Sequence, residues 1–210
     1  MAAAPTTPRI MGQVLIALIP AAGVLLWLFG IGVALNLAAA TATAAAAEAA
    51  AVRLRGRSIR AALGDGSTLV AAAIIALALP PLLPWWIPAT AAGIAALLGK
   101  HAYGGLGQNA FNPAMVGYVA VLLAFPQAMG LWPAPGLGGA VAAPEAVAYF
   151  LGGAQPPMAD ALTYATPLDR LAVEGGAALE QAAGLAGQGR AAGPWLWLSG
   201  AFALGGGFLL

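Results

Sequence analysis

Long apolar runs, separated by short polar or proline-rich breaks, occupy most of the first 132 residues of the chain. A helix that crosses a hydrocarbon layer about 30 Å thick needs roughly 20 such residues. The pattern predicts six helices, of which the third and fourth are short for a complete crossing. The first five cover about residues 10–29, 31–52, 67–79, 85–98 and 114–131, and the sixth begins near residue 194.

Composition places these helices in lipid. Of 210 residues, 61% are hydrophobic and only 7% are charged, with a mean hydropathy of +0.88, whereas about a quarter of an ordinary soluble domain is charged. The sequence therefore predicts an all-α polytopic integral membrane protein. It has no cysteine and a single histidine, His101. Disulfides, thiolate-held iron–sulfur clusters and cysteine-ligated zinc are thus excluded within this chain, and no basic stripe supports nucleic-acid binding.

The basic residues indicate an orientation. Four of the eight lie in the segment RLRGRSIR (Arg53, Arg55, Arg57 and Arg60), and such loops stay on the cytoplasmic side. Counting helices outward places the Trp85–Trp86 turn outside, Lys100 inside, and residues 133–193 outside, in the periplasm. The arginine cluster also suits contacts with lipid headgroups or a partner protein, and neither alternative changes the orientation.

Three parts follow from this count. Residues 1–132 form a five-span membrane bundle, residues 133–193 an external loop, and residues 194–210 the start of a further transmembrane helix. The chain stops inside an apolar run without the interfacial anchors that usually end a membrane helix. We therefore expect a C-terminal portion that this sequence does not contain.

A polar break interrupts the apolar pattern between the fourth and fifth helices. It contains three glycines, two asparagines and a proline (Gly104, Gly105, Gly107, Asn109, Asn112 and Pro113). Pro113 suits the first turn of a helix, with Asn112 as its N-cap. One interpretation is a broken-helix or re-entrant element that lines a pathway or binds a ligand, because irregular backbone at membrane depth must be covered by protein or face a cavity. The other is a cytoplasmic turn followed by a capped helix, and the residues alone leave both open.

The remaining polar residues near the predicted helices receive structural interpretations. His101, beside Lys100 at a membrane edge, is interpreted as interfacial rather than as a proton carrier. Glu48 is expected to pair with the arginine loop, and Asp65 is expected to cap the third helix together with Ser67.

The external segment contains one unusual polar stretch, DALTYATPL, at residues 160–168. By composition alone, Thr163 and Thr166 are loop hydroxyls and Asp160 is a turn or helix-capping residue.

Three segments resemble a known family when they are taken together. LPPLLPWW (79–86), YGGLGQNAFNPAMVGY (103–118) and DALTYATPLDRL (160–171) closely resemble the RnfD family, the D subunits of the Rnf complex, which is an ion-translocating ferredoxin:NAD⁺ oxidoreductase. That family is related to the B subunit of the Na⁺-translocating NADH:quinone oxidoreductase. The resemblance covers essentially the whole chain. It implies a urea-transporter-like fold of two related helical bundles, of which this chain holds the first and the start of the second.

The resemblance also implies a cofactor. Family members carry a motif Asp-x-x-(Ser/Thr)-Gly-Ala-Thr whose last threonine is linked to FMN through a phosphoester. Asp160, Thr163 and Ala165 match that motif, Thr166 would hold the FMN, and Tyr164 stands where glycine is commonest. A non-covalent riboflavin between the helices is implied in the same way.

By the same resemblance, the chain is a subunit of a redox-driven ion translocase in the bacterial inner membrane. It would relay electrons and couple them to movement of Na⁺ or H⁺. Its partners would be the other subunits of the complex and the flavin transferase that matures it. Two alternatives lack a cofactor, namely a channel or transporter of the urea-transporter type and a non-catalytic scaffold.

Overall fold

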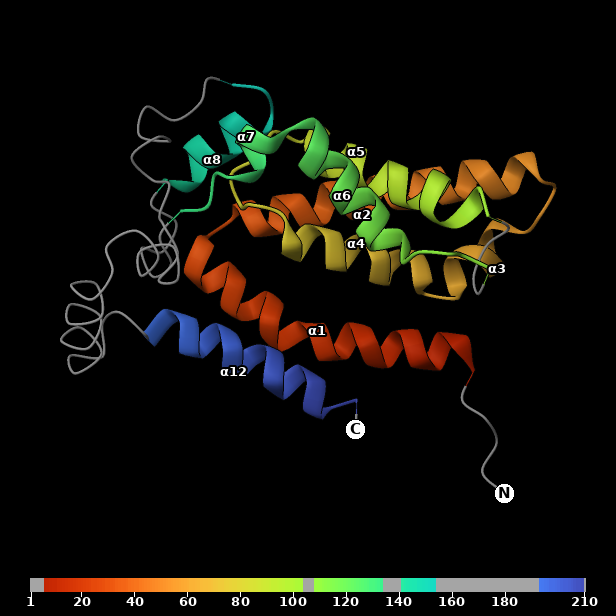
Figure 1. Ribbon diagram of the computed structural model, residues 1–210, viewed down its shortest axis with the longest axis horizontal. Coiled ribbons are helices and arrows are strands. Elements are labelled where there is room, and N and C mark those ends of the chain that lie inside the picture. The colour runs from red at the N-terminus through yellow and green to blue at the C-terminus, as the bar shows by residue number, and fades with distance from the viewer. Residues whose placement is uncertain (1–5, 104–107, 134–140, 154–192, 210) are drawn as a thin grey trace.

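The computed structural model describes residues 6–103, 108–133, 141–153 and 193–209. These residues form helices joined by short connections (Figure 1). The helical segments are α1 (Thr7–Phe29), α2 (Gly32–Leu54), α3 (Ile59–Gly64), α4 (Ser67–Ala78), α5 (Trp86–Ile94), the π-helix η1 (Ala95–His101), α6 (Pro113–Ala124), α7 (Pro126–Met129), α8 (Ala143–Phe150) and α12 (Gly193–Gly207).

The described residues form helices and their connections, and each of the six predicted segments contains helix, which confirms the all-helical fold. The short helices α3 and α8 lie outside the predicted segments. At 1.5 Å per residue, the 23 residues of α1 and of α2 each extend about 35 Å. Within the described parts of the chain, these two are the helices long and apolar enough to cross a membrane. The 12 residues of α4 extend only about 18 Å.

Two predicted helices differ from the structure at their C-terminal ends. The helix expected over residues 114–131 ends at Ala124, and a separate short helix, α7, begins at Pro126. Proline disfavours helical backbone in the residue before it, and Phe125 accordingly leaves the helical region with φ −132° and ψ 55°. The helix expected over residues 85–98 continues to His101, and its second half is a π-helix.

The long helices run side by side with alternating direction (Figure 1). α2 packs against α4 and α5, α6 packs against α5 and η1, and α12 lies along α1. The connection through α3 lies at one end of this bundle, and α7 and α8 lie at the opposite end. Consecutive connections therefore alternate between two ends, as the charge-based count of helices requires.

Small residues set the distances between these helices. A cluster of buried alanines lies where α2, α4 and α5 meet (Ala40, Ala44, Ala72, Ala76 and Ala92). Gly117 of α6 lies against the backbone of Ala91 in α5, and Gly205 of α12 lies against Ala17 of α1, so closely that a Cβ at either glycine would overlap a carbonyl oxygen. Small residues let apolar helices approach until their backbones touch.

The proline-rich turn at residues 79–84 fixes the end of the bundle that carries α8. Asn36 of α2 is fully buried, and its Nδ2 donates to the carbonyl oxygen of Pro80 at 2.7 Å. The backbone N–H of Trp85 donates to the carbonyl oxygen of Phe150, the last residue of α8, at 2.9 Å. Burial raises the pKa of the neighbouring Tyr149 phenol above its ordinary value. α8 is thus attached to the same turn that joins α4 to α5.

The glycine contacts generate a test of helix packing. Gly117→Ala should lower the unfolding free energy by about 1–3 kcal/mol, because the new methyl group meets backbone rather than a movable side chain. The matched control is Gly23→Ala in α1, where no atom lies within 4 Å of the added Cβ and alanine should be neutral or mildly stabilising. Thermal unfolding in detergent micelles measures both, and equal melting temperatures would contradict the packing described.

Candidate functional site: a buried charged cluster between two cavities

A carboxylate and two basic side chains meet inside the bundle, near the end that carries α3. Glu48 of α2 is 1% exposed, and its Oε1 accepts a hydrogen bond from Lys100 Nζ at 2.9 Å. Its Oε2 lies 2.9 Å from Nε2 of His101. Lys100 and His101, at the end of η1, are 6% and 7% exposed. Both oxygens of one buried carboxylate are therefore bound by two consecutive residues of a single helix.

The π-helix explains how two consecutive residues reach the same carboxylate. Its hydrogen bonds join residues five apart, and the backbone N–H of Ala102 donates to the carbonyl oxygen of Leu97 at 2.9 Å. In this wider turn, consecutive side chains point in more similar directions than they do in an α-helix. Such turns are frequent at functional sites. Gly99 allows this segment to pack directly on Pro113, which a Cβ at residue 99 would overlap.

Arg55 fixes the tautomer of His101. Its Nη1 lies 3.2 Å from His101 Nδ1, and its Nη2 donates to the carbonyl oxygen of His101 at 2.7 Å. A guanidinium only donates hydrogen bonds, so Nδ1 accepts and the ring proton sits on Nε2. His101 is thus a neutral imidazole that donates Nε2–H to Glu48.

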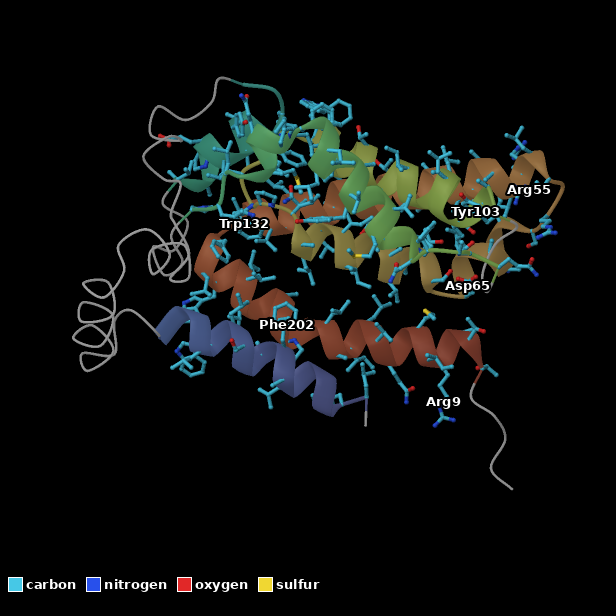
Figure 2. All side chains as sticks on the ribbon, in the orientation of Figure 1. Arg9, Arg55, Asp65, Tyr103, Trp132 and Phe202 are labelled. Atoms are coloured by element: carbon cyan, nitrogen blue, oxygen red, sulfur yellow. The ribbon has the colours of Figure 1, made fainter. Side chains whose placement is uncertain are left out.

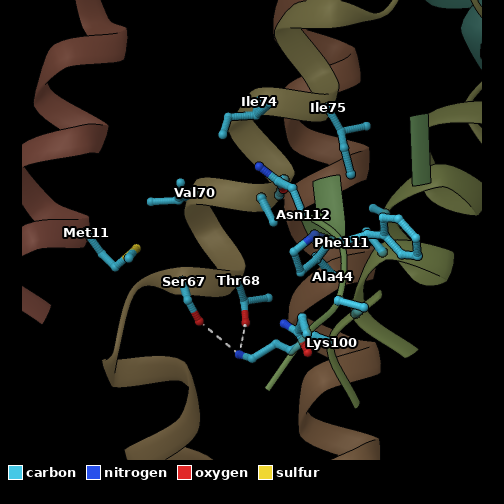
Figure 3. Close-up of a pocket in the computed structure, with 18 residues that line it drawn as sticks. Met11, Ala44, Ser67, Thr68, Val70, Ile74, Ile75, Lys100, Phe111 and Asn112 are labelled. Atoms are coloured by element: carbon cyan, nitrogen blue, oxygen red, sulfur yellow. Dashed lines mark hydrogen bonds between the residues drawn. The ribbon is translucent and has the colours of Figure 1, made fainter. Parts of the chain in front are cut away.

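The N-terminus of α4 completes the cluster. Lys100 Nζ donates to Ser67 Oγ at 2.9 Å and to Thr68 Oγ1 at 3.1 Å (Figure 3). Asp65 accepts from the backbone N–H and the hydroxyl of Ser67 at 2.8 and 2.6 Å, and its Oδ2 lies 3.9 Å from Lys100 Nζ. With neutral His101, the two carboxylates balance the charges of Lys100 and Arg55.

An inner cavity of about 430 Å³ lies on one side of this cluster (Figure 3). Its walls are mainly apolar side chains of α4 and η1, with residues 109–112 and single residues of α1, α2, α5 and α6, and Lys100 is the charged residue among them. The polar lining comes from Ser67, Thr68, Asn109 and Asn112, besides Lys100.

A second, polar cavity of about 360 Å³ lies on the other side, and we call it the vestibule. It lies at the end of the bundle where Arg55 and Asp65 are found (Figure 2). The vestibule is lined by Glu48, Val52, Arg55, Arg57, Ser58, Ala61, Ala62, Asp65, Lys100 and His101. Lys100 therefore borders both cavities.

The structure places part of the predicted polar break at the inner cavity. Asn109, Asn112 and Pro113 line it. The predicted cap is confirmed, because Asn112 Oδ1 accepts from the backbone N–H of Ala114 at 2.9 Å and Pro113 begins α6. The predictions for Gly104, Gly105 and Gly107, and those for the flavin motif (Asp160, Thr163, Ala165 and Thr166), lie outside the described residues.

Sequence reasoning missed the cluster itself. His101 is buried, so its interpretation as an interfacial residue is wrong. The expected pairing of Glu48 with the arginine loop is also wrong, because Glu48 binds Lys100 and His101 instead, and Arg55 reaches His101. Asp65 and Ser67 were expected to cap the third helix, but Gly66 occupies the N-cap position and Ser67 is the first residue of α4. Asp65 does accept the backbone N–H of Ser67 in that first turn. The sequence did contain an indication of this cluster. Glu48 and the pair Lys100–His101 lie in apolar segments that end at the same predicted side of the membrane.

The cluster generates a stability prediction. Lys100→Met leaves the Glu48 carboxylate buried without its cation, which should cost about 3–5 kcal/mol of unfolding free energy. The double variant Glu48→Gln/Lys100→Met removes both charges and should regain most of that loss. Chemical denaturation in detergent micelles compares the two, and a single variant as stable as the double variant would contradict a paired buried charge.

Comparisons with known proteins identify relatives along the whole chain. The model of the NQR2, RnfD, RnfE family matches residues 1–210. The D subunit of the ion-translocating oxidoreductase complex of Pseudomonas aeruginosa (strain LESB58) is 46% identical over 210 residues, which is 97% of this chain and 59% of that protein.

Proteins of the same name in two other bacteria are also similar. The one in Ectopseudomonas mendocina is 44% identical over 80% of this chain and 47% of the relative, and the one in Halorhodospira halophila is 43% identical over 83% and 50%. The chain thus spans about half to three-fifths of the length of these curated relatives. Because the family model matches every residue, the chain belongs to the NQR2, RnfD, RnfE family.

Proposed function

We propose that this chain is part of a membrane subunit that relays electrons through FMN attached to Thr166, within an ion-translocating oxidoreductase complex. The observation that carries this proposal is the sequence Asp160-Ala-Leu-Thr163-Tyr-Ala165-Thr166 in a chain of this family. Its relatives are named as the D subunit of such a complex. The fold proposed for the whole protein is urea-transporter-like, with this chain supplying the first bundle and the start of the second.

The residue types suit covalent attachment of a flavin. The Thr166 hydroxyl offers the oxygen for a phosphoester, and Asp160 is a group that a transferase could read or use to activate that oxygen. Ala165 leaves space for the transferase, and Pro167 keeps the segment out of regular helix. A link through phosphate leaves the redox-active ring of FMN free to supply electron-transfer chemistry.

The arrangement of the helices supports the proposed orientation. Arg9, Arg55 and Asp65 lie toward one end of the bundle, and Trp132 lies toward the other (Figure 2). The turn before Trp85 is bound to α8 at that second end. In the bacterial inner membrane, this arrangement would place residues 53–60 in the cytoplasm and residues 133–193 in the periplasm, where an exported flavin transferase would meet Thr166.

The inner cavity fits a second, non-covalent flavin such as riboflavin. Its volume of about 430 Å³ lies within the range of small-molecule sites. Apolar walls suit a flat aromatic ring, and a few amide and hydroxyl groups suit the ring's polar edge. Asn112 already uses its Oδ1 to cap α6, so its amide nitrogen is the atom that would donate to a ligand. Asn109 and Lys100 are the other candidate contacts.

Coupling to an ion completes the proposal. The break that contains Asn109 and Asn112 joins η1 to α6, and it lines the cavity in which a flavin would change charge. We propose that this element links the redox change to movement of Na⁺ or H⁺ through the assembled complex.

Mass spectrometry tests the covalent flavin. The whole complex, made beside an active flavin transferase, should carry an FMN-sized adduct on the peptide that contains Thr166. Thr166→Ala should remove the adduct and lower electron transfer while the complex still assembles. The matched control Thr90→Ala changes a threonine outside the motif and should keep the adduct.

An unmodified wild-type peptide, with the transferase shown to act on another substrate, would contradict the proposal. It would favour a cofactor-free channel or a scaffold, and Tyr164 would be the first residue to replace by glycine.

Filling the inner cavity tests the non-covalent flavin. Ala71 of α4 lines the cavity, so Ala71→Trp should abolish the flavin released by denaturing the protein and leave the covalent adduct intact. The matched control is Ala203→Trp on the exposed side of α12. Extracted flavin is measured by chromatography, and undiminished flavin in Ala71→Trp would place the ligand elsewhere.

A further inference from the structure

Lys100 lies between two cavities that differ in their lining. Its side chain borders the apolar inner cavity and also the polar vestibule. Glu48 and His101 border the vestibule. The charged cluster thus borders both a cavity lined largely by charged and polar residues, at the end of the bundle that carries α3, and a mainly apolar cavity lined by α4 and η1.

Continuous hydrogen bonds cross this boundary. His101 Nε2 lies 2.9 Å from Glu48 Oε2, and Glu48 Oε1 lies 2.9 Å from Lys100 Nζ. Both distances are within the range for direct proton transfer between side chains. One end of this series of hydrogen bonds is His101 Nδ1, which contacts Arg55 at the vestibule. The other end is the Lys100 ammonium at the wall of the inner cavity.

We propose that His101, Glu48 and Lys100 form a proton route from the vestibule to the inner cavity. The inference rests on the proposed function, because reduction of a flavin in that cavity takes up protons that its apolar walls do not supply. The three residues would connect such a flavin to the vestibule.

Each proton transfer in the route is balanced. Lys100 gives a proton from Nζ to the acceptor in the inner cavity, which is a reduced flavin or a water beside it. His101 binds a proton at Nδ1 from water in the vestibule and becomes an imidazolium. Its Nε2 proton then passes to Glu48, whose carboxyl group turns to deliver it to the neutral amine of Lys100. His101 is left neutral with its proton on Nδ1. Loss of that proton to vestibule water and uptake of one at Nε2, after the ring turns, restore the starting tautomer, so that one proton enters and one leaves in each cycle.

The neighbouring charged groups define what the route requires. Arg55 donates to Nδ1 of His101 and must turn away before that atom takes a proton. Asp65, whose Oδ2 lies 3.9 Å from Lys100 Nζ, is a second carboxylate near the ammonium.

The cluster favours a proton over a metal cation, because the Lys100 ammonium already occupies the position among the oxygens of Glu48, Ser67 and Thr68 that a cation would take.

Proton uptake during reduction of the reconstituted complex tests the route. Lys100→Met and His101→Gln are compared with wild type by stopped-flow, with a pH-indicator dye in the solution and the flavin content measured beforehand. Proton uptake per bound flavin should be about a hundredfold slower in both variants. Added imidazole should restore His101→Gln but not Lys100→Met. The matched control Ser58→Ala changes a vestibule wall outside the route and should match wild type.

Two results would overturn the route. One is proton uptake at the wild-type rate in both variants. The other is slow proton uptake in His101→Gln whose wild-type rate is restored by added Na⁺ and not by imidazole, because the cluster would then serve the cation and not the proton.

A flavin-independent measurement separates this inference from the proposed function. Ala61→Cys, in the vestibule, should react with a charged, membrane-impermeant thiol reagent, and the fully buried Ala40→Cys should not. Wild-type protein without flavin would refute the proposed cavity ligand alone. An unreactive Cys at position 61 would refute the vestibule as the source of protons, whatever the flavin content.

Discussion

The contact between Glu48 and Lys100 is the interaction on which the arrangement of α2, α4 and η1 depends. A buried carboxylate loses several kcal/mol of hydration, and only a close cation with further hydrogen bonds offsets that cost. Glu48 receives its partners from η1, and Lys100 receives two hydroxyls from α4. The three helices must therefore keep one relative position, because any sliding would leave a charge without a partner.

Close packing by small residues makes this contact possible. The alanine cluster between α2, α4 and α5 lets those backbones approach. Gly99 lets the end of η1 rest on the first turn of α6. The same approach places Asn112 and Pro113 beside the charged cluster, where they close one side of the inner cavity. The geometry of the site thus depends on the small residues, Gly99 and the alanine cluster, as well as on the charged ones.

The sequence predicted the helices well because apolar runs of helical length have few other structures open to them in lipid. It also predicted the cap at Asn112, which is a local hydrogen bond. The charged cluster could not be predicted, because its hydrogen bonds join residues that are 52 and 53 positions apart. Its two basic residues also lie together on a π-helix, which the spacing of apolar residues does not reveal. The flavin motif around Thr166 came from family resemblance, and residues 154–192 lie outside the described ranges.

The position of Lys100 connects the electrostatics of the cluster to the proposed redox role. An electron added in the inner cavity creates negative charge among apolar walls, where Coulomb interactions are stronger than in water. Among the lining residues that the structure describes, Lys100 carries the charge, and it is positive. The cluster as a whole is neutral, so its field is weak until the added electron draws Lys100 away from Glu48. Electron arrival would then weaken the contact that fixes η1 against α2 and α4, and η1 leads directly into the break that lines the cavity. A single buried ion pair can in this way link a change in cofactor charge to the position of a helix.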